Sequence, residues 1–229
     1  MKLEAAVCLS LLFLARTVSS LRVVVAGYNS RLVVFDVVGD SLSQSLEWDV
    51  GTQGKDMTWL QLDGDTIWAG HEVGEYEGVQ NSVVSRWQVG ETLERMGYLG
   101  TGSVYTAHLL VDKEQGRAYA ANYGGSTFSV LKLNDDGNLG YVESVFGYGE
   151  GCRDASHPHQ TVSKGQWVWV IDLGCDMVWH YRVVADSGLE LTGQTSIRAG
   201  AGPRHAVFHP TKDLLFLLCE LQSYVQVYR

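Results

Sequence analysis

Residues 202–220, with the sequence GPRHAVFHPTKDLLFLLCE, contain a short strand-like segment, a polar turn and a longer apolar run. This run belongs to a pattern that recurs along the chain, in which an apolar run leads through a polar turn to another strand-like segment. The apolar runs of the successive copies are residues 23–27, 66–70, 118–122, 168–172 and 214–220. Copies of roughly 40 to 50 residues built from strands and turns are typical of β-propeller blades. The sequence therefore predicts an all-β propeller with five blade units.

The composition is that of one globular domain. Of the 229 residues, 45% are hydrophobic and 19% are charged, and helix-like spacing of apolar residues is nearly absent after residue 20. We expect a single propeller domain over residues 21–229. The formal net charge is −9, and Lys and Arg do not cluster. This charge argues against nucleic-acid binding, which requires a basic face, and against attachment to an anionic membrane surface.

The first 20 residues differ from the rest of the chain. Lys2 precedes the apolar run at residues 5–15, and residues 18–20 (VSS) are small enough for a cleavage site. This pattern predicts a secretory signal peptide over residues 1–20, and therefore a secreted, extracellular protein with no membrane attachment after cleavage. A membrane anchor is the alternative, but the run is much shorter than the roughly 20 residues that span a bilayer.

Removal of the signal peptide would leave three of the 4 cysteines, so at most one disulfide can form within the chain. Cys152 lies in an expected loop and Cys175 in an expected turn, which makes them the favoured pair. Cys219 lies in an apolar run, where a buried and unreactive thiol is the common situation. The spacing of Cys and His is not that of a zinc site, and we expect no metal or other cofactor.

Polar side chains follow the apolar runs, at the point where burial should end. Asn122, Asp172 and Glu220 occupy this position in the last three units. In a propeller, equivalent strand ends form a ring around the mouth of the central channel. A carboxylate that follows five apolar residues needs a partner or a cavity, because burying it alone is costly. Arg204 is the natural partner of Glu220, either in a salt bridge that braces the turn or in a functional pair.

Histidines recur before the expected inner strands. His157 and His159 are one residue apart, a spacing that places both side chains on one face of a strand. His108 and His205 hold corresponding places one unit earlier and one unit later. These side chains suit metal binding, acid–base chemistry or hydrogen bonding to local carbonyl groups. Metal binding is disfavoured because the spacing suggests no third ligand.

Several short strings from residue 108 onward resemble the lactonase family of seven-bladed β-propellers, which includes the propeller-type 6-phosphogluconolactonase and 3-carboxy-cis,cis-muconate lactonizing enzyme. The strings are ANYGGS (121–126), DGNLG (136–140), HPH (157–159), DLGCD (172–176), GAGPRH (200–205), FHP (208–210) and EL (220–221). Residues 21–106 share only the rhythm of the blades. The resemblance implies that about five of seven blades are present, so that the propeller is incomplete at its C-terminal end. Its open blade edge would then be available for self-association.

The resemblance also implies a site at one end of the central channel, with His159, Arg204 and Glu220 as its catalytic residues. Arg153 resembles the arginine that precedes the paired histidines of the family, and we expect it to bind substrate. From their positions at the strand ends and before the inner strands, we expect the same of His108, Asn122, His157 and Asp172. Together these residues favour a lactonase-like hydrolase, similar to 6-phosphogluconolactonase, that opens a small acidic sugar lactone. The alternative is a secreted, non-catalytic propeller that acts as a binding or interaction module, because a fold does not fix a function.

Opening a lactone requires a base that activates water and a cation that holds the developing oxyanion or an acidic group of the substrate. His159 suits the first task if its pKa lies near neutrality, as is usual for histidine. Arg204 suits the second task, because its planar guanidinium group binds carboxylate or phosphate through two bonds. Glu220 would orient Arg204 or exchange a proton with the leaving hydroxyl group.

Overall fold

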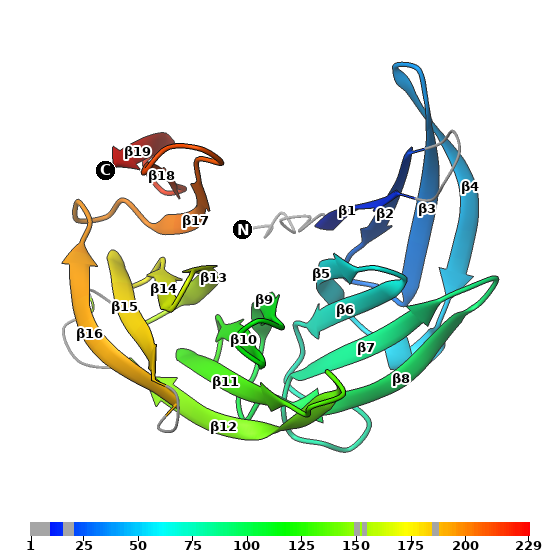
Figure 1. Cartoon of the computed structure of the whole chain (residues 1–229), viewed down its shortest axis with the longest axis horizontal. Helices are drawn as coiled ribbons and strands as arrows, with labels where there is room; N and C mark the ends of the chain where they lie inside the picture. The colour runs from blue at the N-terminus through cyan, green and yellow to red at the C-terminus, as the bar shows by residue number, and fades with distance from the viewer. Residues whose placement is uncertain (1–9, 16–20, 149–151, 153–154, 185–187) are drawn as a thin grey trace, which may run out of the picture.

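The computed structural model describes residues 10–15, 21–148, 152, 155–184 and 188–229. These residues form antiparallel sheets that stand side by side around a common centre, as Figure 1 shows. The all-β propeller architecture predicted from the repeat is confirmed. Each apolar run of the repeat corresponds to the second strand of one sheet, and the turn at residues 134–138 is the hairpin between the third and fourth strands of another. Within the described residues, no helix is long and apolar enough to cross a membrane.

The sheets are called blades 1 to 5 in chain order, and the first strand of each lies innermost (Figure 1). Blade 1 contains β1 (Ser10–Ala15), β2 (Leu21–Ala26), β3 (Arg31–Val38) and β4 (Ser41–Asp49). A 3-10 helix, η1 (Gly51–Gly54), leads to blade 2, which contains β5 (Met57–Asp63), β6 (Thr66–His71), β7 (Val83–Val89) and β8 (Leu93–Gly100). Blade 3 contains β9 (Thr106–Asp112), β10 (Arg117–Asn122), β11 (Thr127–Leu133) and β12 (Leu139–Gly147).

Blade 4 contains β13 (Pro158–Lys164), β14 (Trp167–Asp172), β15 (Met177–Val184) and β16 (Gly188–Ser196). Blade 5 has three strands, β17 (Pro203–Phe208), β18 (Leu215–Cys219) and β19 (Tyr224–Tyr228). Figure 1 shows the five blades as an open arc, with a gap between blade 5 and blade 1.

The core lies between the faces of neighbouring blades, because side chains of a strand alternate between its two sides. On β6, Ile67 and Ala69 pack toward blade 1, whereas Trp68 between them packs toward blade 3. On β10, Ala118 and Ala120 pack toward blade 2, whereas Tyr119 packs toward blade 4. Both faces of these strands are therefore apolar, which explains why the second strand of a blade reads as an unbroken apolar run.

The strand β1 lies within the segment that the sequence predicts to be a signal peptide. It pairs with β2 in register from Ser10 opposite Ala26 to Ala15 opposite Leu21, and it completes blade 1 as a four-stranded sheet. Residues 1–9 and 16–20 lie outside the described residues. The signal peptide and secretion therefore stay predictions.

A register shift recurs at the start of the inner strand in blades 2 to 5. In blade 4, Pro158 pairs with Asp172 and Gln160 pairs with Ile171, so that His159 has no opposite residue. The extra residue is Thr58 in blade 2, Ala107 in blade 3, His159 in blade 4 and Arg204 in blade 5. Such bulges turn a side chain away from the plane of the sheet, and they are common beside active sites.

Candidate active site

The shared bulge brings His159 and Arg204 to the same end of the channel. The imidazole rings of His159 and His205 lie 5.0 Å apart, edge to face, and Arg204 directly precedes His205 in β17. Arg204 donates from Nη1 to Oε2 of Glu220, which follows the end of β18. The predicted catalytic residues His159, Arg204 and Glu220 therefore lie in one cluster, even though they come from two blades.

Burial and a neighbouring positive charge lower the pKa values of the two histidines in this cluster. His159 is 4% exposed, and burial together with the neighbouring Arg204 lowers its pKa to about 2. Burial lowers the pKa of His205 to about 4, with Arg204 acting in the same direction and Glu220 against it. Both rings are therefore neutral at pH 7. The expectation that the pKa of His159 lies near neutrality is wrong for the site without substrate, because desolvation and Arg204 both disfavour the imidazolium form.

The Nδ1 atom of His159 is buried and makes no hydrogen bond with any part of the chain that the structure describes. Buried polar atoms are nearly always hydrogen-bonded, and a neutral imidazole nitrogen can accept or donate one bond. A substrate or a water molecule would satisfy this atom.

Tyr123 contacts both histidines of the HPH string. Its ring stacks on that of His157 at 4.4 Å and meets the edge of His159 at 5.7 Å. The Nδ1 atom of His157 also lies 2.9 Å from the carbonyl oxygen of Tyr123. His157 precedes β13 rather than lying on it, so the two histidines do not share a strand face, and their rings meet Tyr123 at different angles, one stacked and one edge-on.

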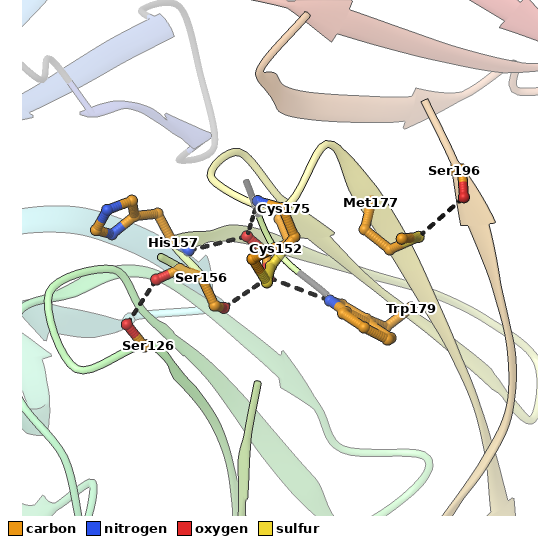
Figure 2. Close-up of a disulfide and its surroundings, with 9 residues drawn as sticks. Ser126, Cys152, Ser156, His157, Cys175, Met177, Trp179 and Ser196 are labelled. Atoms are coloured by element: carbon orange, nitrogen blue, oxygen red, sulfur yellow. Dashed lines mark hydrogen bonds between the residues drawn. A yellow bond between two sulfur atoms is a disulfide. The ribbon is translucent and has the colours of Figure 1, made fainter. Parts of the chain in front are cut away.

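Asp172 holds the segment that carries these histidines. Its carboxylate accepts hydrogen bonds from Ser156 Oγ at 2.6 Å, from the backbone N–H of His157 at 2.9 Å, from that of Cys175 at 3.1 Å and from Trp179 Nε1 at 3.2 Å. The predicted disulfide between Cys152 and Cys175 is confirmed, and it lies beside Ser156 and His157 (Figure 2). Cys219 is free and buried, as expected.

The same β14–β15 turn positions Arg204. Asp176 accepts hydrogen bonds from the backbone N–H groups of Gly200 and Gly202, at 2.6 and 2.8 Å. The carbonyl group of Gly202 in turn accepts a 2.8 Å bond from the backbone N–H of Glu220. One turn of blade 4 therefore fixes both the loop before His159 and the loop before Arg204.

His108 lies deeper along the channel, where its Nδ1 atom is 3.2 Å from Thr161 Oγ1 and its ring is 4.1 Å from that of Trp59. Burial, together with the charges of His205 and His159, lowers its pKa well below the usual value. His108 and Trp59 lie in an open cavity of about 550 Å³ that is lined by residues of β5, β9, β13 and β17. The channel beyond the cluster is therefore lined by an aromatic ring, a neutral imidazole and other residues of the inner strands.

The other predicted binding residues are placed differently. Asn122 is fully buried, and its amide group bonds to Thr106, Thr127 and Ser129 within blade 3. Asp172 is also fully buried beneath His157. Arg153 lies outside the described residues. Contact of these three residues with a substrate stays a prediction.

Three residues of the site were not singled out from the sequence: Trp59, Tyr123 and Glu72. Glu72 directly follows β6, as Glu220 directly follows β18. The apolar runs of the sequence end at Gly70 in blade 2 and at Glu220 in blade 5, so an alignment on these runs is two residues short in blade 2. Aligning the ends of the second strands, rather than their apolar runs, would have identified Glu72.

The comparisons with known proteins agree with this fold. A profile of the family described as "Lactonase, 7-bladed beta-propeller" matches residues 23–229. The chain therefore belongs to the seven-bladed lactonase propeller family.

Individual relatives match only part of this chain, at modest sequence identity. An uncharacterized protein of Lactococcus lactis subsp. lactis, YwcC, is 31% identical over 143 residues, which are 60% of this chain and 42% of that protein. The 6-phosphogluconolactonase of Bacillus subtilis is 30% identical over 124 residues, 52% of this chain and 35% of the enzyme. Each match thus spans less than half of the relative's length.

Two solved structures share the fold. A protein of Lactobacillus plantarum has a TM-score of 0.79 at 25% identity, covering 91% of this chain and 62% of that one. The periplasmic gluconolactonase PpgL of Pseudomonas aeruginosa has a TM-score of 0.72 at 21% identity, covering 86% and 59%.

Proposed function

We propose that the chain carries the lactone-binding and catalytic groups of a lactone hydrolase, acting on a small acidic sugar lactone as 6-phosphogluconolactonase does. The observation that carries this proposal is the cluster of His159, Arg204 and Glu220 at one end of the channel. It provides a neutral imidazole with a buried nitrogen that is not bonded to described residues, beside a guanidinium group held by a carboxylate. Family membership and the relative named 6-phosphogluconolactonase support the same chemistry.

Arg204 would bind the acidic group of the substrate or the oxyanion that forms at the lactone carbonyl. Water adds to this carbonyl carbon, the ring C–O bond breaks, and the products are a carboxylate and a hydroxyl group. His159 would accept the proton of the attacking water and return it to the leaving alkoxide, and the carboxylic acid that forms would release its proton to solvent. Glu220, which is paired with Arg204, would orient the guanidinium group.

Because the pKa of His159 is low, the proposed mechanism favours an acidic substrate. Arg204 is one cause of that low pKa. An anionic group bound to Arg204 would offset its charge, and an opposite charge nearby favours the imidazolium form. An acidic lactone would therefore make His159 a better base than a neutral lactone would.

The test is hydrolysis of 6-phosphogluconolactone by the 229-residue chain and by its H159N and R204A variants. We expect turnover by the wild type, a fall in kcat of roughly a hundredfold or more for H159N, and a rise in KM for R204A. Wild-type rates in both variants would contradict the assignment.

A non-catalytic binding module is the second candidate, and the neutral histidines favour it. Burial lowers the pKa of His108, His159 and His205 alike, and a neutral, desolvated ring suits hydrogen bonding more than proton transfer. Saturable binding of 6-phosphogluconate without any lactone hydrolysis would select this candidate.

We also infer that the protein acts outside the cytosol. The apolar run at residues 5–15 and the Cys152–Cys175 disulfide support this inference, since disulfides persist mainly in oxidising compartments. Sequencing the N-terminus of the mature protein tests it, because cleavage after about Ser20 would remove β1, whereas retention of β1 would contradict the signal peptide.

A further inference from the structure

Blade 2 has the same local strand pairing that positions Arg204 and Glu220 in blade 5. In blade 5, Pro203 pairs with Cys219 and His205 with Leu218, which leaves Arg204 as the extra residue and places Glu220 directly after β18. In blade 2, Met57 pairs with His71 and Trp59 with Gly70. Thr58 is then the extra residue, and Glu72 directly follows β6. Glu72 is therefore the structural equivalent of Glu220.

A carboxylate at this position is not a general feature of the blades. The residue that directly follows the second strand is Tyr123 in blade 3 and Leu173 in blade 4. Among the described blades with this bulge, blades 2 and 5 therefore place a carboxylate directly after the second strand, namely Glu72 and Glu220.

Glu72 faces the same space as the candidate active site. Arg204 lowers its pKa, while burial, the largest effect, raises it. Burial raises the pKa of Tyr123, Glu220 and Glu72 act in the same direction, and Arg204 acts against them. The ring of Trp59, which follows the extra residue of blade 2, lies 6.1 Å from the ring of His205, which follows the extra residue of blade 5. The corresponding ends of the two inner strands therefore face the same space, and blade 2 lies across the arc from blade 5 (Figure 1).

The environment of Glu72 is polar, although the residue is half buried. Tyr28, which follows β2 in blade 1, donates from its hydroxyl to Oε2 of Glu72 at 2.6 Å. Thr58 and Tyr28 both act to keep the carboxyl group ionised. An ionised carboxylate has about four acceptor positions, so it retains capacity for hydroxyl groups of a ligand after these bonds.

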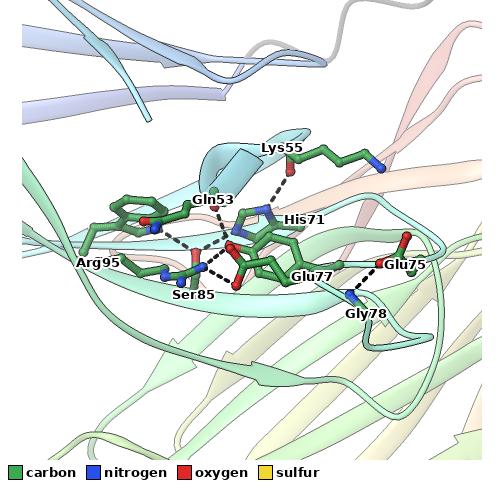
Figure 3. Close-up of polar contacts among 10 residues, drawn as sticks. Gln53, Lys55, His71, Glu75, Glu77, Gly78, Ser85 and Arg95 are labelled. Carbon is green, nitrogen blue, oxygen red and sulfur yellow. Dashed lines mark hydrogen bonds and ion pairs between the residues drawn. The ribbon is translucent and has the colours of Figure 1, made fainter. Parts of the chain in front are cut away.

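The backbone that carries Glu72 is held firmly. Its N–H donates to the carbonyl oxygen of Asp56 at 3.0 Å. The preceding residue, His71, is hydrogen-bonded through both ring nitrogens, as Figure 3 shows. Its Nδ1 atom lies 2.6 Å from the carbonyl oxygen of Lys55, and its Nε2 atom lies 2.7 Å from Ser85 Oγ. Groups fixed in this way contribute more to binding, because little ordering is needed when the ligand arrives.

We propose that Glu72, supported by Tyr28, binds hydroxyl groups of the substrate across the opening from Arg204, and that the site therefore prefers polyhydroxylated sugar lactones to simple lactones. This inference rests on the proposed function and specifies its substrate class. Arg204 would bind the charged or carbonyl end of the ligand, and Glu72 would accept bonds from its hydroxyl groups.

The test compares D-gluconolactone with δ-valerolactone, a lactone of the same ring size that has no hydroxyl groups. For E72Q, we expect KM for gluconolactone to rise about tenfold to a hundredfold with kcat little changed, because a charged hydrogen bond to the substrate is weakened. Kinetics with δ-valerolactone should stay as in the wild type. E91Q removes an exposed carboxylate from the distant β7–β8 turn of the same blade and is the matched control.

Equal losses on both lactones, or no loss on either, would overturn the inference. Y28F is the second variant, used if E72Q fails to fold. It keeps the carboxylate but removes its support, and it should raise KM for gluconolactone alone.

If the wild type hydrolyses neither these two lactones nor 6-phosphogluconolactone, the proposed function fails while this inference is still decided by calorimetric titration. D-gluconate should then bind the wild type more tightly than hydroxypentanoate does, and E72Q should abolish the difference. Equal affinities, or no binding of gluconate, would overturn the inference.

Discussion

Arg204 and Glu220 form a salt bridge that joins the start of β17 to the turn after β18, with side chains 24% and 41% exposed. A salt bridge this open to solvent contributes little to stability. It does, however, hold the guanidinium group beside the buried ring of His159, whose pKa responds to it. The pair is therefore better explained as part of a site than as a brace for the turn.

We predict that R204K impairs function but not folding. Lysine keeps the charge but loses the planar fork that binds an oxyanion through two bonds. We expect kcat/KM for an acidic lactone to fall about tenfold or more, and the free energy of unfolding to change by less than about 1 kcal/mol. R182K, in the exposed Arg182–Glu190 pair, is the control. Unchanged kinetics in R204K would show that the fork is not used.

We predict that removing the Asp172 carboxylate impairs folding. Its carboxylate accepts four hydrogen bonds inside blade 4 and is fully buried. Removing it in D172A leaves those donors without an acceptor, and the expected loss is about 3 kcal/mol or more in the free energy of unfolding by urea. D36A is the control, because Asp36 pairs with Arg22 at the exposed surface. Near-wild-type stability in D172A would contradict this structural role.

The fold was largely predictable from sequence, because the buried second strands carry the repeat. Strands such as β6 and β10 are buried along their whole length, so both faces must be apolar and the run is visible without knowledge of the structure. The expected pairing of Cys152 with Cys175 and the buried state of Cys219 are likewise confirmed.

The site was less predictable, because its geometry depends on bulges. A bulge adds one residue to a strand without a distinct composition: the extra residues Thr58, Ala107, His159 and Arg204 have no chemical property in common. Glu72 is hidden for another reason, because the apolar run of blade 2 ends at Gly70, two residues before it. The pKa of His159 was misjudged because desolvation and the charge of Arg204 arise only after blades 4 and 5 pack together.

We predict that acid destabilises the protein between about pH 6.5 and pH 4. His71 is fully buried, and desolvation lowers its pKa from 6.5 to about 4. Between these values the unfolded chain binds more protons than the folded chain, so the free energy of unfolding falls as the pH is lowered. The contribution of His71 is about 3 kcal/mol, present in full above pH 6.5.

Urea unfolding at about pH 7 and pH 4.5 measures this loss, and the non-titrating variant H71Q should show a smaller difference between the two conditions. An identical pH dependence in H71Q and in the wild type would mean that other groups are responsible.

We predict that the 229-residue chain self-associates through blade 5. Within the described residues, β19 pairs with β18 alone, and Val225 and Val227 are 55% and 47% exposed. An edge strand with exposed apolar side chains pairs readily with another chain, and charged residues prevent such pairing. V227K should therefore shift the sedimentation profile toward monomer. V38K, at an exposed position of β3, should not. A monomeric wild type at about 50 µM would contradict the prediction.

Finally, we predict that reduction of the Cys152–Cys175 disulfide weakens both the fold and the site. The two cysteines are 23 residues apart, and a loop of this length stabilises the folded state by about 3 kcal/mol through the entropy of the unfolded chain. The disulfide also ties the segment before His157 to the β14–β15 turn, and His157 stacks on Tyr123. The C152S/C175S double variant should therefore show both lower resistance to urea and a higher KM for the lactone.

C219A provides the matched control, because Cys219 is free and lies outside the disulfide. Dithiothreitol should lower the stability of the wild type and of C219A, but not that of the double variant. A double variant with normal stability and a raised KM would place the effect of the disulfide in the site alone. A double variant unchanged in both measurements would contradict the prediction.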